Sequence, residues 1–150
     1  MITILNRIIA LVTGRGRRLS NFEWMILNMV RKDLTEDIKL LWDKQISTIN
    51  KIGRAPEGIE VNFYRMSSGQ PTFNKHISFP NKSAELLVAE VRVRIEDSDE
   101  LSAKVWCLNG FLFSIEYDRC PDYFEEAAGM ETDICPLTLA CTMRGDLSAR

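Results

Sequence analysis

Few side chains in this 150-residue chain have types and spacing suited to chemistry. His76 is the only histidine, and Glu116 and Asp118 stand two residues apart, so that in a strand both carboxylates share one face. A histidine beside two carboxylates could act as a general acid or base if a substrate lies within hydrogen-bond distance. Nothing in the sequence brings His76 to the carboxylates. A small carboxylate-based enzyme is therefore one hypothesis, and an exposed or capping histidine is the simpler interpretation.

The sequence predicts neither a metal site nor a cofactor site. The four cysteines lie 13, 15 and 6 residues apart, which matches neither a zinc site nor a dense secreted disulfide framework. One histidine cannot complete the usual set of imidazole and thiolate ligands. Gly14 and Gly16 lack the third glycine of a dinucleotide-binding turn, because Leu19 stands in its place. Reduced thiols at Cys107, Cys120, Cys135 and Cys141 indicate a cytoplasmic protein.

Charge is distributed unevenly along the chain. Residues 1–54 carry ten Lys/Arg and five Asp/Glu, whereas residues 55–150 carry nine and sixteen, so the net charge of −2 hides segments of +5 and −7. Only Lys104 and Arg119 offset the acidic residues from 96 to 133. Such a region repels nucleic acid and can steer a basic protein, or it can simply keep the surface solvated. Its acidic residues are Glu96, Asp97, Asp99, Glu100, Glu116, Asp118, Asp122, Glu125, Glu126, Glu131 and Asp133.

The first 18 residues are expected to form an apolar helix followed by a basic linker. Residues 1–13 are apolar at helical spacing, but Asn6 and Arg7 interrupt the run, which is shorter than the ~20 apolar residues that a membrane span needs. We therefore expect no membrane span and a helix packed on the rest of the domain. A helix lying on a lipid surface is the alternative, because three arginines follow within residues 15–18.

Two further helices are predicted in the first third of the chain. Ser20 followed by Glu23 forms the pattern of a capping box, which marks a helix start. Thr35 can cap the next helix, whose first turn is acidic, as the helix dipole favours. The core faces are expected to comprise Phe22, Met25, Ile26, Met29 and Val30 in the first helix, and Ile38, Leu41, Trp42 and Ile46 in the second.

The clearest strand signal lies between Leu86 and Asp118. Leu87, Ala89, Val91, Val93 and Ile95 alternate with Glu90, Arg92, Arg94 and Glu96, which is typical of a half-buried strand. Residues 104–108 and 111–117 flank Asn109-Gly110, a pair that tolerates the positive φ angles of a tight hairpin. These three segments are therefore predicted to form three antiparallel strands. Weaker alternation predicts strands after Ser47, over 59–64 and over 73–79, with a loop at 67–71.

These elements indicate one α+β domain spanning residues 1–150. Helices in the first third, followed by a meander of about five to six strands, predict N-terminal helices packed on one face of a mainly antiparallel sheet. The length is that of one domain with its own core. Residues 121–150 are expected to be a less regular tail with a helical turn over 123–127.

Trp106 raises the question of what covers the second face of the sheet. Either Trp106 with Leu108 or Val105 with Cys107 must face away from the helices, so one apolar set remains. A sheet covered on both faces is the favoured prediction, because the N-terminal helix needs a surface to pack on. In the alternative, Trp106, Leu108 and Leu112 form an exposed patch that binds a partner.

Three classes of function remain open. The favoured hypothesis is a non-catalytic protein-binding module, of the inhibitor or immunity type, that neutralises a basic protein through an acidic surface. The alternatives are the carboxylate-based enzyme and a structural subunit of a larger assembly. No nucleic-acid partner is expected. The predicted contact residues are Glu96, Asp97, Asp99, Glu100, Glu116 and Asp118, with Trp106 as a possible anchor.

Overall fold

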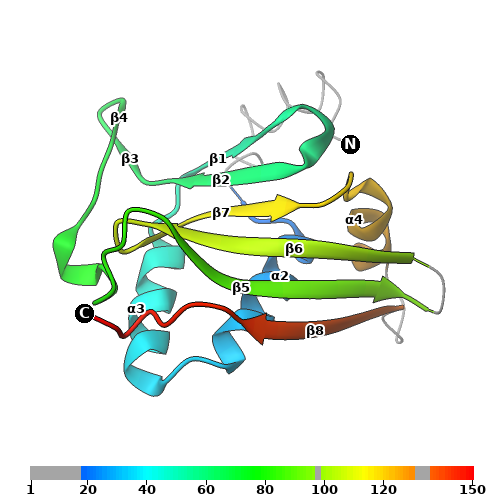
Figure 1. Cartoon of the computed structure of the whole chain (residues 1–150). Helices are drawn as coiled ribbons and strands as arrows, with labels where there is room; N and C mark the ends of the chain where they lie inside the picture. Colours follow the sequence, from blue (N-terminus) through cyan, green and yellow to red (C-terminus); the bar gives the residue numbers. More distant parts are fainter. Residues whose placement is uncertain (1–17, 97–98, 131–135) are drawn as a thin grey trace.

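The fold is α+β, as predicted (Figure 1). A computed structural model describes residues 18–96, 99–130 and 136–150. In these residues three α-helices pack on a six-stranded sheet, and a small second sheet has two strands. The helix expected over 1–13 and most of its basic linker lie outside the described residues, as do Asp97 and Cys135.

The sheet is antiparallel between all neighbouring strands that the structure describes. Its strands are β1 (Lys51–Arg54), β2 (Glu60–Tyr64), β5 (Leu86–Ile95), β6 (Asp99–Leu108), β7 (Phe111–Tyr117) and β8 (Leu137–Met143). Their order in the sheet is β1-β2-β7-β6-β5-β8. β5, β6 and β7 form the predicted three-stranded meander, with Asn109 and Gly110 at φ angles of 52° and 91° in the turn between β6 and β7. This turn is the predicted tight hairpin.

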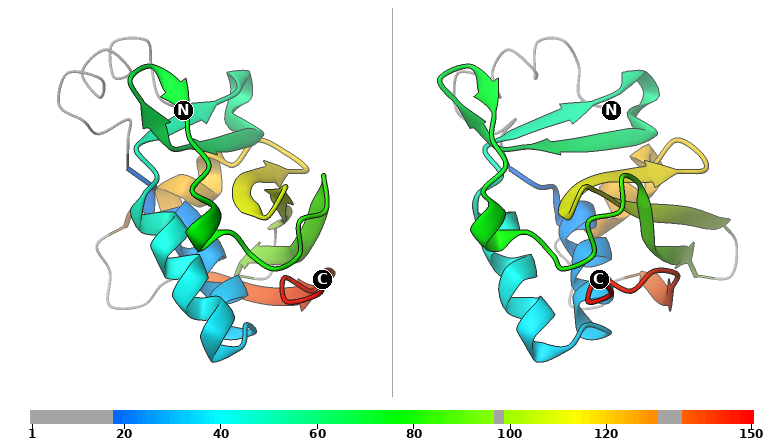
Figure 2. Two further views of the ribbon diagram at one scale, coloured as in Figure 1. Left: turned by 90° about the vertical axis from the view of Figure 1, so that its left-hand side faces the viewer. Right: turned by 60° about the vertical axis from the view of Figure 1, so that its left-hand side comes forward.

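Helices α2 (Asn21–Lys32), α3 (Glu36–Ser47) and α4 (Asp122–Ala128) lie on one face of the sheet (Figures 1 and 2). In the described ranges no element covers the other face, which we call the open face. The N-terminal helix expected to cover it lies outside these residues, so a sheet covered on both faces stays a prediction. α2 begins with the predicted capping box: Glu23 N donates to Ser20 Oγ at 3.1 Å, and Ser20 N donates to Glu23 Oε1 at 2.7 Å.

The core lies between the helices and the inner face of the sheet. Leu101, Ala103, Val105 and Cys107 alternate along β6 and are all buried, which settles which side of this strand faces the helices. Phe22 of α2 stacks with Tyr117 at 5.8 Å and with Phe124 of α4 at 6.0 Å between ring centroids. Leu27 is fully buried, whereas the predicted core residues Met25 and Met29 are only partly buried.

A buried polar network fastens α3 to the turn between β6 and β7. The fully buried Gln45 side chain donates from Nε2 to Ile77 O at 2.7 Å and to Gly110 O at 3.0 Å, and its Oε1 accepts from Leu112 N at 2.8 Å. Arg65 donates to Leu112 O at 3.1 Å and to Gln45 O at 3.2 Å. Burial lowers the pKa of Arg65 to about 10, so the guanidinium stays charged at neutral pH. We call these groups the Gln45–Arg65 network.

Two β-bulges change the alternation that the sequence predicts. The pairing of β5 with β6 shifts between Leu87 and Ala89, so Val88 is fully buried and Leu87, predicted to point inward, is only half-buried. The pairing of β6 with β7 shifts between Trp106 and Cys107, and Leu112 is fully buried instead of forming part of an exposed patch. A bulge adds one residue to one strand and therefore breaks the period of two.

The strand predicted over residues 73–79 is wrong. Lys75–Ile77 form a 3₁₀ turn, η3, because the Asn74 side chain accepts a hydrogen bond from His76 N at 3.0 Å and closes the backbone locally. Phe79 beyond it is fully buried, and its N–H donates to Gly110 O at 2.8 Å. His76 therefore lies on an exposed turn instead of an edge strand.

Two other segments are more regular than predicted. The expected loop at 67–71 includes part of a short hairpin of β3 (Met66–Ser67) and β4 (Gln70–Pro71). The expected irregular tail over 121–150 contains α4 at the predicted helical turn and, beyond it, the edge strand β8. The strand expected after Ser47 is present and begins at Lys51.

Replacing Gln45 with alanine should leave the Ile77 carbonyl and the Leu112 amide without a partner, whereas the Gly110 carbonyl keeps its hydrogen bond from Phe79 N. Because each unsatisfied buried group costs about 1–3 kcal/mol, we expect the free energy of unfolding to fall by about 3 kcal/mol or more. Urea denaturation followed by tryptophan fluorescence measures this loss. Lys44→Ala, at an exposed position of the same helix, is the control and should change stability by less than about 0.5 kcal/mol. Equal losses in the two variants would contradict the role of the network.

Candidate functional site

Acidic residues of several elements lie at one end of the sheet, which is the right-hand end in Figure 1. β2 and β6 begin at this end, β5 and β7 finish there, and α4 lies beside it. The antiparallel topology thus joins carboxylates from segments that are far apart in sequence. We call this group the acidic pole. It comprises Glu57, Glu60, Glu96, Asp99, Glu100, Glu116, Asp118, Asp122 and Glu126.

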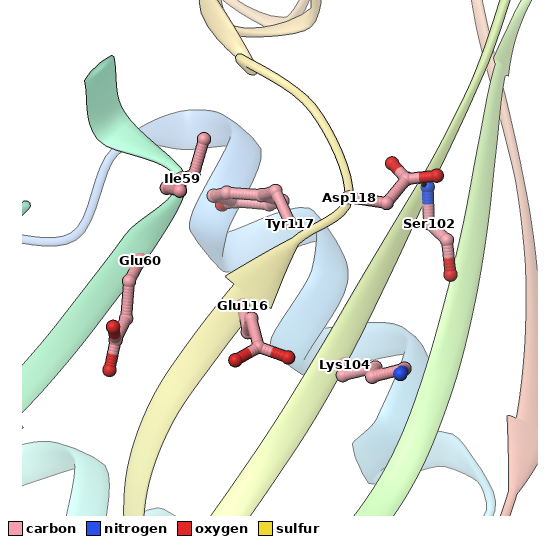
Figure 3. A pocket seen from close by; sticks show the side chains of 7 residues that line it. All are labelled: Ile59, Glu60, Ser102, Lys104, Glu116, Tyr117 and Asp118. Carbon is pink, nitrogen blue, oxygen red and sulfur yellow. Dashed lines mark hydrogen bonds between the residues drawn. The ribbon is translucent and has the colours of Figure 1, made fainter.

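A hollow of about 220 Å³ lies within the acidic pole (Figure 3). Glu60 of β2 and Glu116 of β7 are direct neighbours in the sheet, and their carboxylates point the same way into solvent. Lys104 of β6 is the next residue in this row, and Glu90 of β5 follows it. The row therefore places one ammonium group between carboxylates on both sides. Ile59, Ser102, Tyr117 and Asp118 complete the lining of the hollow.

Two predicted contact residues are already engaged within the protein. Glu100 accepts a hydrogen bond from Arg94 at 3.1 Å, and Arg92 lies 3.8 Å from its other carboxylate oxygen. Asp118 accepts from Ser102 N at 3.0 Å and so extends the pairing of β7 with β6 by one side chain. Both residues remain at the acidic pole, but much of their charge or hydrogen-bonding capacity is used internally.

The other predicted acidic contacts are exposed. Glu116 faces solvent beside Glu60 at the rim of the hollow. Glu96 and Asp99 are exposed at either side of the turn between β5 and β6, and Glu96 has a φ angle of 48°, which is rare for a residue other than glycine. Asp97 lies between them, outside the described residues. The exposed carboxylates are therefore those best placed to meet a partner.

Trp106 lies on the open face, in the centre of the sheet. It is flanked by Ser114 of β7 and Leu87 of β5, and it is half-buried. Lys104 and Glu116, which line the hollow, occupy the adjacent row of the same face. The structure thus brings the predicted anchor and the exposed carboxylate Glu116 onto one surface.

A second, mainly apolar hollow of about 140 Å³ lies at the opposite end of the open face. Its lining includes Phe73, which is 62% exposed and packs on Phe111 with ring centroids 5.4 Å apart. Tyr64 and Phe113 meet edge to face at 5.8 Å on its other side. Sequence reasoning missed this group, because it arises from the turn between β6 and β7 meeting the segment after β4.

A buried cluster of titratable groups lies beneath the acidic pole. Glu23 is fully buried and accepts from Arg54 Nη2 at 2.8 Å. Ser20 Oγ donates to Glu125 Oε1 at 2.9 Å, which links the start of α2 to α4. The Tyr117 hydroxyl is buried and has no hydrogen-bond partner among the described residues. Burial raises the pKa of Tyr117 well above its usual value, and the negative charges of Glu23 and Glu125 raise it further.

The sequence held a partial signal for this cluster. The capping box identified Glu23 as the residue that turns back on Ser20, but a helix-start carboxylate is usually exposed. Its burial depends on the contact with Arg54 of β1. Local sequence patterns do not show that β1 lies beside α2. Glu125 counted only as one of many acidic residues, and its contact with Ser20 joins positions 105 residues apart.

The arrangement does not assemble the catalytic constellation that the enzyme hypothesis requires. His76 lies on η3, close to the start of β7, because Gln45 binds both Ile77 O and Gly110 O there. Glu116 and Asp118 lie at the other end of β7. The hollow of about 220 Å³ is smaller than the ~300–1,000 Å³ typical of small-molecule sites. Among the described residues, no group of three or more His, Cys, Asp or Glu could hold a metal ion.

Comparisons of the chain with models of protein families, with curated proteins and with solved structures find no match. No helix in the described ranges is both long and apolar enough to cross a membrane. The functional argument therefore depends on the residues of the open face and the acidic pole.

The stability of the protein should depend on the ionisation of Glu125. Burial, and next the negative charge of Glu23, raise the pKa of Glu125 to about 7, against 4.5 for an ordinary glutamate. Between these values the folded state binds more protons than the unfolded state, so the free energy of unfolding should fall as the pH rises from about 4.5 to about 7, by roughly 1–3 kcal/mol. Urea denaturation across this pH range measures the slope.

Glu125→Gln should remove this part of the slope, because the amide oxygen can still accept from Ser20 but the side chain does not ionise. Glu126→Gln, at the exposed neighbouring position, is the control and should keep the wild-type slope. If Glu125→Gln and wild type lose stability in parallel between these pH values, Glu125 is not the group that titrates.

Proposed function

We propose that the protein is a non-catalytic binding module, of the inhibitor or immunity type, that neutralises a basic protein through the acidic pole and the open face. The observation that carries this proposal is the gathering of carboxylates from β2, β6, β7, the adjoining turns and α4 at one end of the sheet. A surface of one sign raises the rate of encounter with a partner of the opposite sign and rejects partners of the same sign. The same charge argues against a nucleic-acid partner.

The charge of the acidic pole is only partly balanced by nearby cations. Arg54 is held by Glu23, and Arg94 by Glu100, so these two cations are matched with internal carboxylates. Lys104 stands beside Glu116 but also faces Glu90 in the same row. The exposed carboxylates, among them Glu96, Asp99 and Glu116, therefore remain a source of negative potential for an incoming basic side chain.

Trp106 supports a protein partner over a small ion. Tryptophan is among the residues that contribute most to protein interfaces, especially near the centre of the buried patch. Trp106 lies between the acidic pole and the apolar hollow around Phe73, so one partner could place basic side chains at one end and an apolar side chain at the other. Charge would set the rate of association, and the aromatic contacts would hold the complex.

The alternatives from other classes keep weaker support. A carboxylate-based enzyme could use the neighbouring Glu60 and Glu116 beside Lys104, but the hollow they line is small. A structural subunit of a larger assembly would need an interface that no other element covers, for which the open face is a candidate. We also place the protein in the cytoplasm, because the described cysteines Cys107, Cys120 and Cys141 are free thiols.

Reversing two exposed charges at the acidic pole should weaken partner binding. The partner is first captured from native lysate on tagged protein at low salt, eluted at high salt and identified by mass spectrometry. For Asp99→Lys/Glu116→Lys we expect the affinity for the purified partner to fall about tenfold or more at low salt, with a smaller loss at high salt. Glu36→Lys/Glu85→Lys makes the same change in net charge elsewhere and should bind like wild type. Equal affinity of the two variants would refute the acidic contact.

Trp106→Ala should weaken the same complex in a different way. Loss of an interface anchor costs more than ~1.4 kcal/mol, so we expect at least a tenfold fall in affinity that does not vary with salt, seen mainly as faster dissociation. Surface plasmon resonance with the purified partner measures both rates. Trp106→Phe keeps an aromatic ring and should retain part of the affinity, and urea denaturation checks that each variant folds. Unchanged dissociation of Trp106→Ala would remove Trp106 from the interface.

A further inference from the structure

Within the part of the chain that the structure describes, the sequence of the edge strand β8 lacks the residues that usually protect an edge from pairing with another chain. β8 pairs only with β5 among the described strands, and no other strand lies beyond it in Figure 1. Its seven residues, Leu137–Met143, include no charged residue and no proline. Its register with β5 runs without a shift along the whole strand. Edge strands are normally kept from pairing by lysine, proline, bulges or short length, and β8 has none of these.

The opposite edge of the same sheet is built differently. β1 has only four residues, and charged side chains stand at both of its ends, Lys51 and Arg54. Gly53 within it weakens the strand further. The edge at β1 is thus protected against pairing by its short length and charged ends, whereas β8 is not. We therefore consider β8 as the edge that pairs with another strand.

The side chains of β8 are sorted by face. Thr138, Ala140 and Thr142 are exposed on the open face. Leu139, Cys141 and Met143 point toward the helices and are only partly buried against the core. An apolar row that is half-buried is typical of a strand with one neighbour instead of two, and a further strand would remove more of this apolar surface from water.

We propose that β8 pairs with β8 of a second copy of this chain, antiparallel and about a two-fold axis at Ala140. The strand is symmetric in character about that residue. Thr138 would stand opposite the partner's Thr142, and Leu139 opposite the partner's Cys141. Threonine pairs and apolar pairs both stabilise neighbouring strands, and no like charges meet within the strand. A two-fold dimer requires such a self-complementary surface.

This dimer is independent of the proposed function, because it uses the edge of the sheet and leaves the acidic pole and Trp106 uncovered. The strand that pairs with β8 is β8 of a second copy and not a strand of another protein, because threonine meets threonine on one face and apolar residues meet on the other. The result would be one continuous sheet made from two six-stranded sheets.

Paired lysine and glutamate variants at the two-fold axis test the geometry. Light scattering after size exclusion, over a range of concentrations, should give twice the monomer mass for wild type. Ala140→Lys and Ala140→Glu each place like charges opposite one another, and each should raise the concentration at which the dimer half-dissociates by at least tenfold. An equal mixture of the two should recover the dimer, because opposite charges then meet. Ala140 is exposed, so neither change disturbs the core.

Gln70→Lys, at an exposed position of β4, is the matched control and should dimerise like wild type. Hydrogen exchange should show protection of alternate amides in residues 137–143 that is lost in Ala140→Lys. A wild-type protein that remains monomeric throughout the concentration range overturns the proposal. A dimer that Ala140→Lys leaves intact also overturns it, since its interface would lie elsewhere.

Discussion

The position of α3 on the sheet depends on burying polar groups that must all find partners. The turn between β6 and β7 directs the Gly110 carbonyl and the Leu112 amide into the interior, where Gln45 satisfies both. Arg65, which directly follows β2, donates hydrogen bonds to the carbonyls of Gln45 and Leu112. Because a buried group left without a partner costs more than a made bond contributes, this set allows one position of α3 against the turn. The end of the open face that carries the apolar hollow is built on that turn.

Local signals in the sequence identified the elements whose structure is determined locally. Asn109-Gly110 specifies its hairpin through backbone conformation, and Ser20 with Glu23 specifies a helix start through two hydrogen bonds. The signal for β8 was weak, because an edge strand with threonine and alanine on its outer face lacks the polar alternation that marked β5. The turn at Lys75–Ile77 was missed since one asparagine side chain outweighed a short apolar alternation.

The candidate site could be predicted only in part. Composition indicated an acidic surface, and most of its residues do lie at one end of the molecule. Composition could not show that Glu60 of β2 joins Glu116, because the pairing of β2 with β7 links segments that share no local pattern. Nor could it show that Glu100 is matched by Arg94. Charge is a property of residues, whereas potential depends on their three-dimensional neighbours.

The strand order also determines how this sheet can fold. The hairpin of β1 with β2 and the meander of β5, β6 and β7 connect neighbours in sequence, so both can form early. Two steps are different: β2 with β7, and β8 with β5, each join residues about fifty positions apart, and closing such loops is slow. Until β8 arrives, the long strand β5, whose inward row is apolar, presents an unpaired edge. A partly folded chain in which β8 has not yet paired exposes this edge to other chains, and how long it stays exposed depends on the speed of that pairing.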